Sequence, residues 1–190
     1  IKTTKHQESQ KEILLAIENG SLFLKENQNK DGSWGSASQT KGLNIFAPVP
    51  GSHGAFRLAV TALASSALIE CKKDDKSYNE CLEKAKQYIL EKLPALRRAT
   101  GMALYNVWAH AYGIQALHRI HGITFSEIER AQITELIRHQ VSMLEKYESI
   151  DGGWGYYDFR AQTKQPSGSS ISFVNATALV CLLYTSPSPR

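Results

Sequence analysis

Two features that would indicate a membrane or nucleic-acid-binding protein are missing from this sequence. No stretch approaches the ~18 uncharged apolar residues that a membrane span needs, so we expect no transmembrane segment. Lys and Arg total 22 against 18 Asp and Glu, giving a net charge of +4, and the basic residues form no run of five or more. Nucleic-acid binding usually requires a concentrated basic patch, so we expect no nucleic-acid partner. With 42% hydrophobic and 21% charged residues, the composition is that of a soluble globular protein rather than a disordered one.

Cysteine is also scarce. The three cysteines, Cys71, Cys81 and Cys181, form neither a CxxC pair nor a Cys/His spacing that would bind zinc. We therefore expect no disulfide framework, no metal site and no cofactor. Cys71 and Cys81 are interpreted as buried free thiols, and a pairing of the two across a loop is the alternative.

The two ends of the chain lack natural signals. Residue 1 is Ile rather than Met, and residues 181–190 (CLLYTSPSPR) are similar to the peptide encoded by a sequencing adapter read in frame. We expect residues 1–180 to be a fragment of a larger protein and residues 181–190 to be a non-native tail. Because the true N-terminus is absent, the sequence predicts no compartment.

Apolar residues recur at helical spacing, and no sustained period-2 pattern of a β-strand is present. Amphipathic helices are predicted over residues 9–27, over residues 79–93, and from Ser126 onward. Ser77 is expected to cap the second of these helices. Ser126 is expected to cap the third, with Glu129 three residues later in a capping-box arrangement.

Three further helices are apolar on all sides and rich in small residues, over residues 53–70, 103–120 and 170–183. Such helices are usually buried on every side. They alternate along the chain with the amphipathic helices, which predicts an all-α fold of about three αα-hairpins with outer and inner helices. An array of this kind is a solenoid or a closed (α/α) toroid.

A short motif occurs twice between an outer and an inner helix. Asp31-Gly32-Ser33-Trp34-Gly35 recurs as Asp151-Gly152-Gly153-Trp154-Gly155, and each copy begins seven residues after a leucine, Leu24 or Leu144. Asp-Gly favours a turn in which Gly takes a positive φ. The tryptophan is expected to fold back over the hairpin, where its indole N–H needs a hydrogen-bond acceptor.

The first copy resembles the QW repeat of squalene–hopene and oxidosqualene cyclases, and more broadly the terpenoid cyclase/protein prenyltransferase superfamily. The matching residues are Gly20, Phe23, Leu24, Gln28, Gly32 and Trp34; the second copy has Met143 and Glu148 in place of the aromatic residue and the glutamine. The resemblance covers about residues 10–180 and implies part of an (α/α) toroid that closes with about twice as many hairpins. It also implies a structural role for Gln28 and Trp34, which would tie neighbouring outer helices together.

No catalytic motif of that superfamily carries over. The cyclases protonate their substrate through an Asp-rich DxDD motif, whereas the adjacent acids here, Asp74 and Asp75, lie in a polar turn without the spaced first Asp. The Asp/Cys/His zinc set of the prenyltransferases is absent as well. Whether this chain belongs to an enzyme is therefore not predicted, and a cyclase acid would lie outside it.

Six residues are candidates for lining a cavity. Tyr105, Trp108 and His110 lie on the second inner helix, and Tyr156, Tyr157 and Asp158 lie in the loop after the second motif. Aromatic rings of this kind can stabilise a cation. The alternatives are a buried histidine bonded to a neighbouring helix, which is the commoner role, and a loop whose acid pairs with Arg160 or Lys164.

The expected function is therefore binding of an apolar ligand, such as an isoprenoid, in a toroid cavity. A non-catalytic repeat scaffold that binds a protein or a glycan on the toroid rim is the alternative. A hydrolase or lyase acting on polysaccharide is a third possibility. A pocket lined by the candidate residues would favour ligand binding, and a filled core would favour the scaffold.

Overall fold

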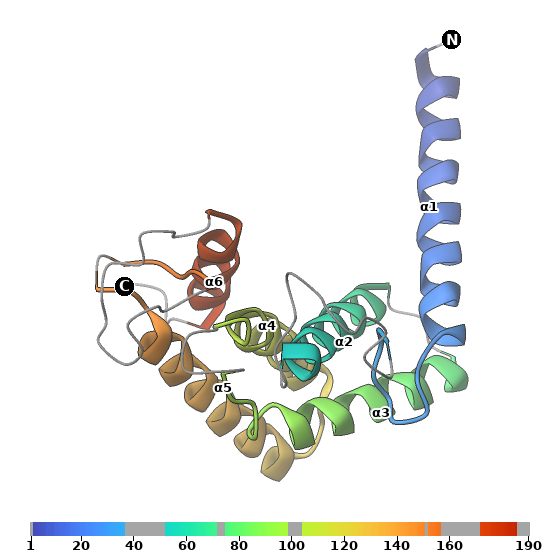
Figure 1. Cartoon of the computed structure of the whole chain (residues 1–190). Helices are drawn as coiled ribbons and strands as arrows, with labels where there is room; N and C mark the ends of the chain where they lie inside the picture. The colour runs from blue at the N-terminus through green and yellow to red at the C-terminus, as the bar shows by residue number, and fades with distance from the viewer. Residues whose placement is uncertain are drawn as a thin grey trace.

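In the computed structural model, the described residues are 2–36, 52–71, 75–98, 104–150, 152–156 and 172–185, and their regular structure is entirely helical (Figure 1). The predicted all-α class is thus confirmed. The helices are α1 (Lys2–Glu26), α2 (Ser52–Cys71), α3 (Lys76–Lys92), α4 (Val107–Ile123), α5 (Glu127–Tyr147) and α6 (Ser172–Thr185). Each corresponds to one predicted helix. The largest differences in the bounds are at the start of α1, which begins at Lys2, and of α4, which begins at Val107.

One predicted helix cap is confirmed and another is wrong. The Ser126 side chain accepts a hydrogen bond from the Glu129 backbone N–H at the start of α5 (3.3 Å). The cap of α3 is Asp75 rather than Ser77: its carboxylate accepts from the backbone N–H groups of Ser77 (2.7 Å) and Tyr78 (3.4 Å). An ionised carboxylate is a stronger acceptor at a helix N-terminus than a hydroxyl, and Ser77 instead lies in the first turn.

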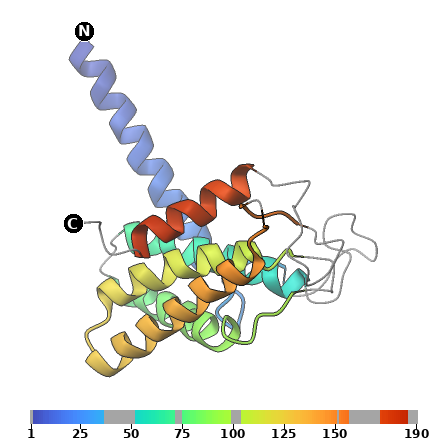
Figure 2. The same ribbon diagram turned by 90° about the vertical axis from the view of Figure 1, so that its left-hand side faces the viewer.

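The three inner helices form one layer, in which α4 lies between α2 and α6 (Figures 1 and 2). Helix α3 packs on α2, and α5 packs on α4, on the same side of this layer. Short links join α2 to α3 and α4 to α5, so each closely packed pair consists of an inner helix followed by an outer one. Helix α1 contacts α2 only near its C-terminal end and projects away from the rest of the molecule (Figure 1).

The core lies between the two layers and where neighbouring inner helices meet, and it is built mainly from aliphatic and small side chains. Ala55, Ala62, Ala109 and Ala116 are fully buried where α2 meets α4, and small side chains let two helices approach closely. A second cluster joins α4, α5 and α6, and includes Cys181, because α6 continues past residue 180.

Burial on every side, which we expected for all three inner helices, holds best for α4, the helix with a neighbour on both sides. Helix α2 leaves Val60 and Leu63 exposed, and α6 leaves Leu179 exposed. The reason is positional: α4 lies between α2 and α6 and also packs on α5, whereas α2 and α6 are the two ends of the inner layer and are covered less completely.

Helix α2 is relevant to the expectation that the chain has no transmembrane segment. Among the described residues it is the one helix long and apolar enough to cross a membrane by length and composition. A core helix passes the same test, and 44% of the relevant window of α2 is buried inside the molecule.

Candidate functional site

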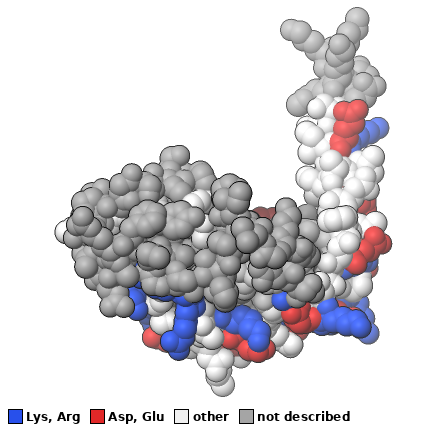
Figure 3. Space-filling model, in the orientation of Figure 1, with Lys and Arg blue, Asp and Glu red and all other residues white. Residues whose placement is uncertain are grey.

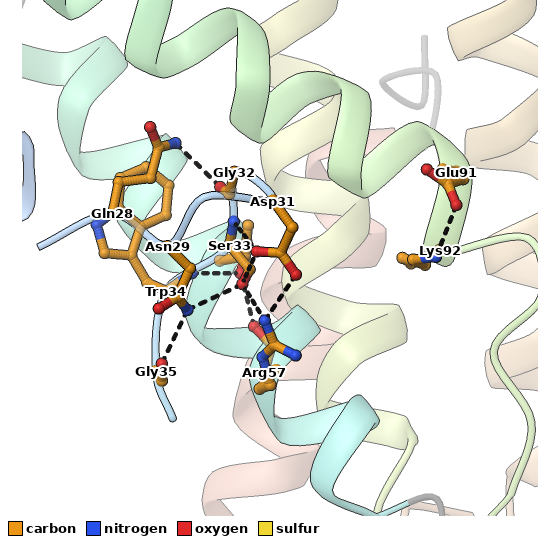
Figure 4. Close-up of polar contacts among 11 residues, drawn as sticks. Gln28, Asn29, Asp31, Gly32, Ser33, Trp34, Gly35, Arg57, Glu91 and Lys92 are labelled. Atoms are coloured by element: carbon orange, nitrogen blue, oxygen red, sulfur yellow. Dashed lines mark hydrogen bonds and ion pairs between the residues drawn. The ribbon is translucent and has the colours of Figure 1, made fainter. Parts of the chain in front are cut away.

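The first repeated turn is held by hydrogen bonds within the turn and to α2 (Figure 4). Gly32 has a φ of +86°, as the Asp-Gly pair predicts. The Asp31 carboxylate accepts from the Ser33 backbone N–H (3.1 Å) and hydroxyl (2.7 Å), and it pairs with the Arg57 guanidinium of α2 (2.8 Å). Burial acts against ionisation of Asp31, but these Ser33 and Arg57 contacts outweigh it and hold the pKa of the carboxyl below its ordinary value.

Trp34 folds back over the turn and is buried. Its indole N–H donates to the Leu24 carbonyl at the end of α1 (2.7 Å), and its backbone N–H donates to the Thr61 hydroxyl in α2 (3.0 Å). The tryptophan therefore joins an outer helix to the following inner helix.

Gln28 connects the same turn to the next outer helix. Its side-chain amide donates to the Gly32 carbonyl (3.0 Å) and to the Cys81 carbonyl of α3 (2.9 Å). Beside it, a Cβ atom added at Gly32 would lie 2.3 Å from the Lys84 carbonyl oxygen, so only glycine allows the turn to approach α3 this closely.

The second turn repeats this geometry. The Trp154 indole N–H donates to the Leu144 carbonyl (2.9 Å), and its backbone N–H donates to the Asn175 side chain of α6 (2.6 Å). Gly152 has a φ of +81°, and Asp151 lies outside the described residues. The contacts in both turns join helices, which indicates a structural role for the motif.

His110 is buried at the interface of α4 and α5, with 1% of its surface exposed. Its Nδ1 lies 2.7 Å from Gln140 Oε1, and its Nε2 lies 3.1 Å from Asn106 Nδ2. An amide oxygen can only accept, so in this arrangement Nδ1 carries the proton and Nε2 accepts from Asn106. Burial lowers the pKa of His110 to about 4, and the Gln140 hydrogen bond opposes that shift. A neutral imidazole with both nitrogens bonded is suited to joining two helices.

The candidate aromatic residues fall into two groups. Tyr105 is buried between Phe56 (ring centroids 5.6 Å apart) and Tyr156 (5.1 Å). Trp108 lies outside this group and stacks on Tyr112 at 5.4 Å. Tyr157 and Asp158 lie outside the described residues. Of the six candidates, Trp108 and Tyr156 are the described ones that keep partial exposure.

Trp108 lies on a face of the inner layer that was not predicted from the sequence. Residues 108, 112, 115 and 119 share one side of α4, and residues 56, 60, 63, 67 and 70 share one side of α2, because both sets recur at helical spacing. On α4 this side lies opposite His110, which points toward α5. We define the inner face as Val60, Leu63, Trp108, Tyr112 and Gln115. The helical spacing of these residues could have predicted that they share a face. Whether that face is exposed depends on where α3 and α5 pack.

An ion pair marks one end of the inner face. The Arg119 guanidinium of α4 lies 2.9 Å from the Glu70 carboxylate of α2. The face therefore changes from aromatic and aliphatic side chains to charged ones along the helix axes.

A cavity of about 360 Å³ lies elsewhere, between the two layers, and none of the predicted site residues lines it. Lys86 lines this cavity, and its ammonium nitrogen forms ion pairs with the carboxylates of Glu83 (2.7 Å) and Glu129 (2.8 Å). Burial acts against the charge on Lys86, but the two carboxylates raise its pKa above the ordinary value. This volume is near the lower limit for small-molecule sites. The cavity is lined by Ser65, Ile69, Asn79, Leu82, Glu83, Lys86, Ile120, Ile123, Thr124, Phe125, Ser126 and Glu129.

No metal-binding group was found among the described residues, where no three His, Cys, Asp or Glu side chains gather closely enough to hold an ion. The three cysteines are free. Of the two that were expected to be buried free thiols, Cys81 is buried, but Cys71 is only half-buried; Cys181 is buried as well. Burial raises the pKa of Cys181 to about 12.

Comparisons with protein-family models, with curated proteins and with solved structures give no match. The resemblance to terpenoid cyclase repeats therefore depends on the residues of the turns.

Proposed function

We propose that this chain is part of an (α/α) toroid of the terpenoid cyclase/protein prenyltransferase type, and that its inner face binds an apolar ligand such as an isoprenoid. The observation that carries the proposal is the inner face itself, where aliphatic and aromatic side chains remain accessible on helices that are otherwise buried. Support for the toroid comes from the two turns, in which Trp34 and Trp154 make equivalent bonds to an outer and an inner helix.

The side chains of the inner face suit an elongated hydrocarbon. Val60 and Leu63 are each 43% exposed, and covering them with a ligand removes apolar surface from water at about 25 cal/mol per Å². Trp108 and Tyr112, which stack on each other and are half-buried, add aromatic surface, which favours packing against isoprenoid chains and attracts positive charge. The Glu70–Arg119 pair at the end of the face offers a polar group to the head of an amphiphile.

The proposal concerns binding rather than catalysis. His110 is buried and bonded on both nitrogens, so it is not placed to act on a ligand at the inner face. A cyclase reaction would need an acid from outside this chain. Incubation with squalene and with a prenyl diphosphate, followed by product analysis, tests that extension separately.

Tryptophan fluorescence tests the binding proposal directly. Trp34 and Trp154 are buried with their indole N–H groups bonded, so we expect titration with farnesol to change mainly the emission of Trp108. A saturable change in the native chain that is lost in Trp108→Phe would support binding at the inner face.

Two matched variants locate the site. Leu63→Asp places a charge on the inner face and is expected to weaken farnesol binding at least about tenfold, because an apolar contact becomes a buried charge. Ile128→Asp changes an exposed apolar residue on α5, 76% exposed, and is expected to leave binding unchanged. No saturable binding, or equal loss in both variants, would overturn the proposal.

A non-catalytic repeat scaffold that binds a protein or a glycan on the toroid rim, with no ligand in the cavity, is the second candidate. The observation that favours it is the packing of Tyr105 between Phe56 and Tyr156, which fills space where a cavity wall was expected. Absence of farnesol and prenyl diphosphate binding in a folded chain would support the scaffold.

A further inference from the structure

The cavity between the two layers is formed by α2, α3, the end of α4, the start of α5 and the link that joins α4 to α5. Helices α1 and α6 contribute no described residue to it, so it does not depend on either edge of the helical array. Ser65 and Ile69 line it from α2, on the side that helical spacing places opposite Val60 and Leu63. The cavity is therefore separate from the inner face.

Part of the cavity wall is apolar. Ile69, Leu82 and Ile120 line it. Ile123 and Phe125 line it as well, with 49% and 98% of their surfaces exposed, so they lie at its rim. A ligand that covers the Phe125 ring removes apolar surface from water, and the ring attracts positive charge.

The charged lining residues carry an excess of negative charge. They are Lys86, Glu83 and Glu129, and the Lys86 ammonium pairs with Oε2 of Glu83 and Oε1 of Glu129. Two carboxylates therefore share one cation. A carboxylate offers about four acceptor positions, so both groups keep the capacity to accept further hydrogen bonds. The Lys86 and Glu129 side chains are only 17% and 30% exposed, which limits screening of the excess charge by solvent ions.

This charge imbalance is local to the cavity. On the face shown in Figure 3, acidic and basic side chains are interspersed along the outer helices α3 and α5, and pairs such as Glu135–Arg138 balance each other. An anion at the cavity would place three negative charges around one positive charge, whereas a cation gives two of each sign. Charge complementarity therefore favours a positively charged ligand.

We propose that this cavity binds a small molecule that has a primary ammonium group on an apolar body. The ammonium group lies beside Lys86 and donates to the carboxylates of Glu83 and Glu129, as its three N–H donors allow. The apolar body lies against Ile69 and Ile120 and under the Phe125 ring. The volume of about 360 Å³ is within the range of small-molecule sites. This site is independent of ligand binding at the inner face.

Isothermal titration calorimetry of the full chain with three matched probes tests the proposal. The probes are 2-phenylethylamine, which is protonated at pH 7 as lysine is, the neutral 2-phenylethanol and the anionic 3-phenylpropanoate. The amine is expected to bind saturably with one molecule per chain, at least about tenfold more tightly than the alcohol, and the acid is expected not to bind. Absence of saturable amine binding, equal binding of the amine and the alcohol, or tighter binding of the acid would overturn the proposal.

Substitutions in the charged group test the position of the ammonium group. Glu129→Gln is expected to weaken amine binding at least about tenfold, because one charge-assisted hydrogen bond is lost. Lys86→Met is expected to strengthen it at least about threefold, because the ligand no longer shares the carboxylates with a resident cation. Glu135→Gln, which removes an exposed carboxylate of α5 away from the cavity, is expected to leave binding unchanged. Unchanged binding in Glu129→Gln, or weaker binding in a folded Lys86→Met variant, would overturn the assignment.

A rim variant tests the same site without altering the core. Phe125 is almost fully exposed, so Phe125→Ala is expected to keep the native circular dichroism spectrum and to weaken amine binding at least about threefold. Ile128→Ala changes an apolar residue of α5 that is 76% exposed and does not line the cavity, and it is expected to bind as the native chain does. Equal affinities of the two variants would place the ligand elsewhere and overturn the proposal.

Discussion

At the residue scale, the two turns use glycine for different reasons. Gly32 and Gly152 both have a positive φ, but only Gly32 also faces the backbone of a neighbouring helix. The Asp-Gly sequence was enough to predict the positive φ. The approach of Lys84 to Gly32 was not predictable, because it depends on where α3 packs.

Gly32→Ala and Gly152→Ala separate these two effects. Gly152→Ala is expected to lower the free energy of unfolding by about 1 kcal/mol, the cost of a left-handed conformation for an L-residue. Gly32→Ala adds a 2.3 Å contact with the Lys84 carbonyl oxygen and is expected to cost about 2 kcal/mol more. Urea unfolding monitored by circular dichroism measures both. Equal losses in the two variants would contradict the close packing of the first turn on α3.

His110 is the buried titratable residue with the clearest consequence for stability. Its pKa is lowered from 6.5 to about 4 in the folded chain. Between these values the unfolded chain binds a proton that the folded chain does not. The free energy of unfolding is therefore highest above pH 6.5, and it falls as the pH drops from 6.5 toward 4.

The size of this effect is about 3 kcal/mol between pH 6.5 and pH 4, at about 1.4 kcal/mol per pKa unit. His110→Gln is expected to remove this part of the pH dependence, whatever its own effect on stability. His118→Gln, at an exposed position on the same helix, is the control for removing a histidine outside the core. Urea unfolding at several pH values gives the comparison, and parallel slopes for the native chain and His110→Gln would contradict a neutral buried histidine.

At the element scale, the helices follow the apolar periodicity of the sequence, and their ends follow local polar contacts. All six helices were predicted because a 3.6-residue period and small-residue content are local properties. Individual ends were less predictable. Ser126 satisfied the expected cap, whereas at α3 the carboxylate of Asp75 competes with Ser77 for the same N–H groups.

Replacing the two competing cap residues tests the assignment at α3. Asp75→Ala is expected to lower the free energy of unfolding by about 1 kcal/mol, since it leaves the first N–H groups of α3 without a side-chain acceptor. Ser77→Ala is expected to cost clearly less, because Ser77 donates its hydroxyl to Asp75 and accepts only from Lys25 (3.2 Å). Thermal unfolding checks the order, and a larger loss for Ser77→Ala would restore the cap expected from the sequence.

At the scale of the whole molecule, protection from solvent is greatest in α4. This helix packs on α2, α5 and α6, whereas α1 touches the body near its C-terminal end (Figure 1). Ser21, near that end, is buried, and it is the one buried residue among residues 9–26 of α1. Local opening is easiest where few apolar contacts must be broken.

Amide hydrogen exchange should therefore follow this order. Amides of α1 before Ser21 are expected to exchange fastest among the helices, and those of α4 slowest. Mass spectrometry of peptic fragments gives the comparison. Protection of the first half of α1 equal to that of α4 would contradict a helix standing clear of the body.

The sequence by itself determined the helical class, the six helices and the two turns, because periodicity, capping residues and Asp-Gly pairs act over short distances. Only the tertiary structure decided the environment of each candidate residue. His110 and Tyr105 lie in the core because α5 and Phe56 pack over them. The helical spacing of Trp108, Tyr112 and Gln115 places them on one side of α4, but it could not show that this side lies opposite α5. The pairing of inner with following outer helices also emerged only in three dimensions, because burial depends on contacts between segments that are far apart along the chain.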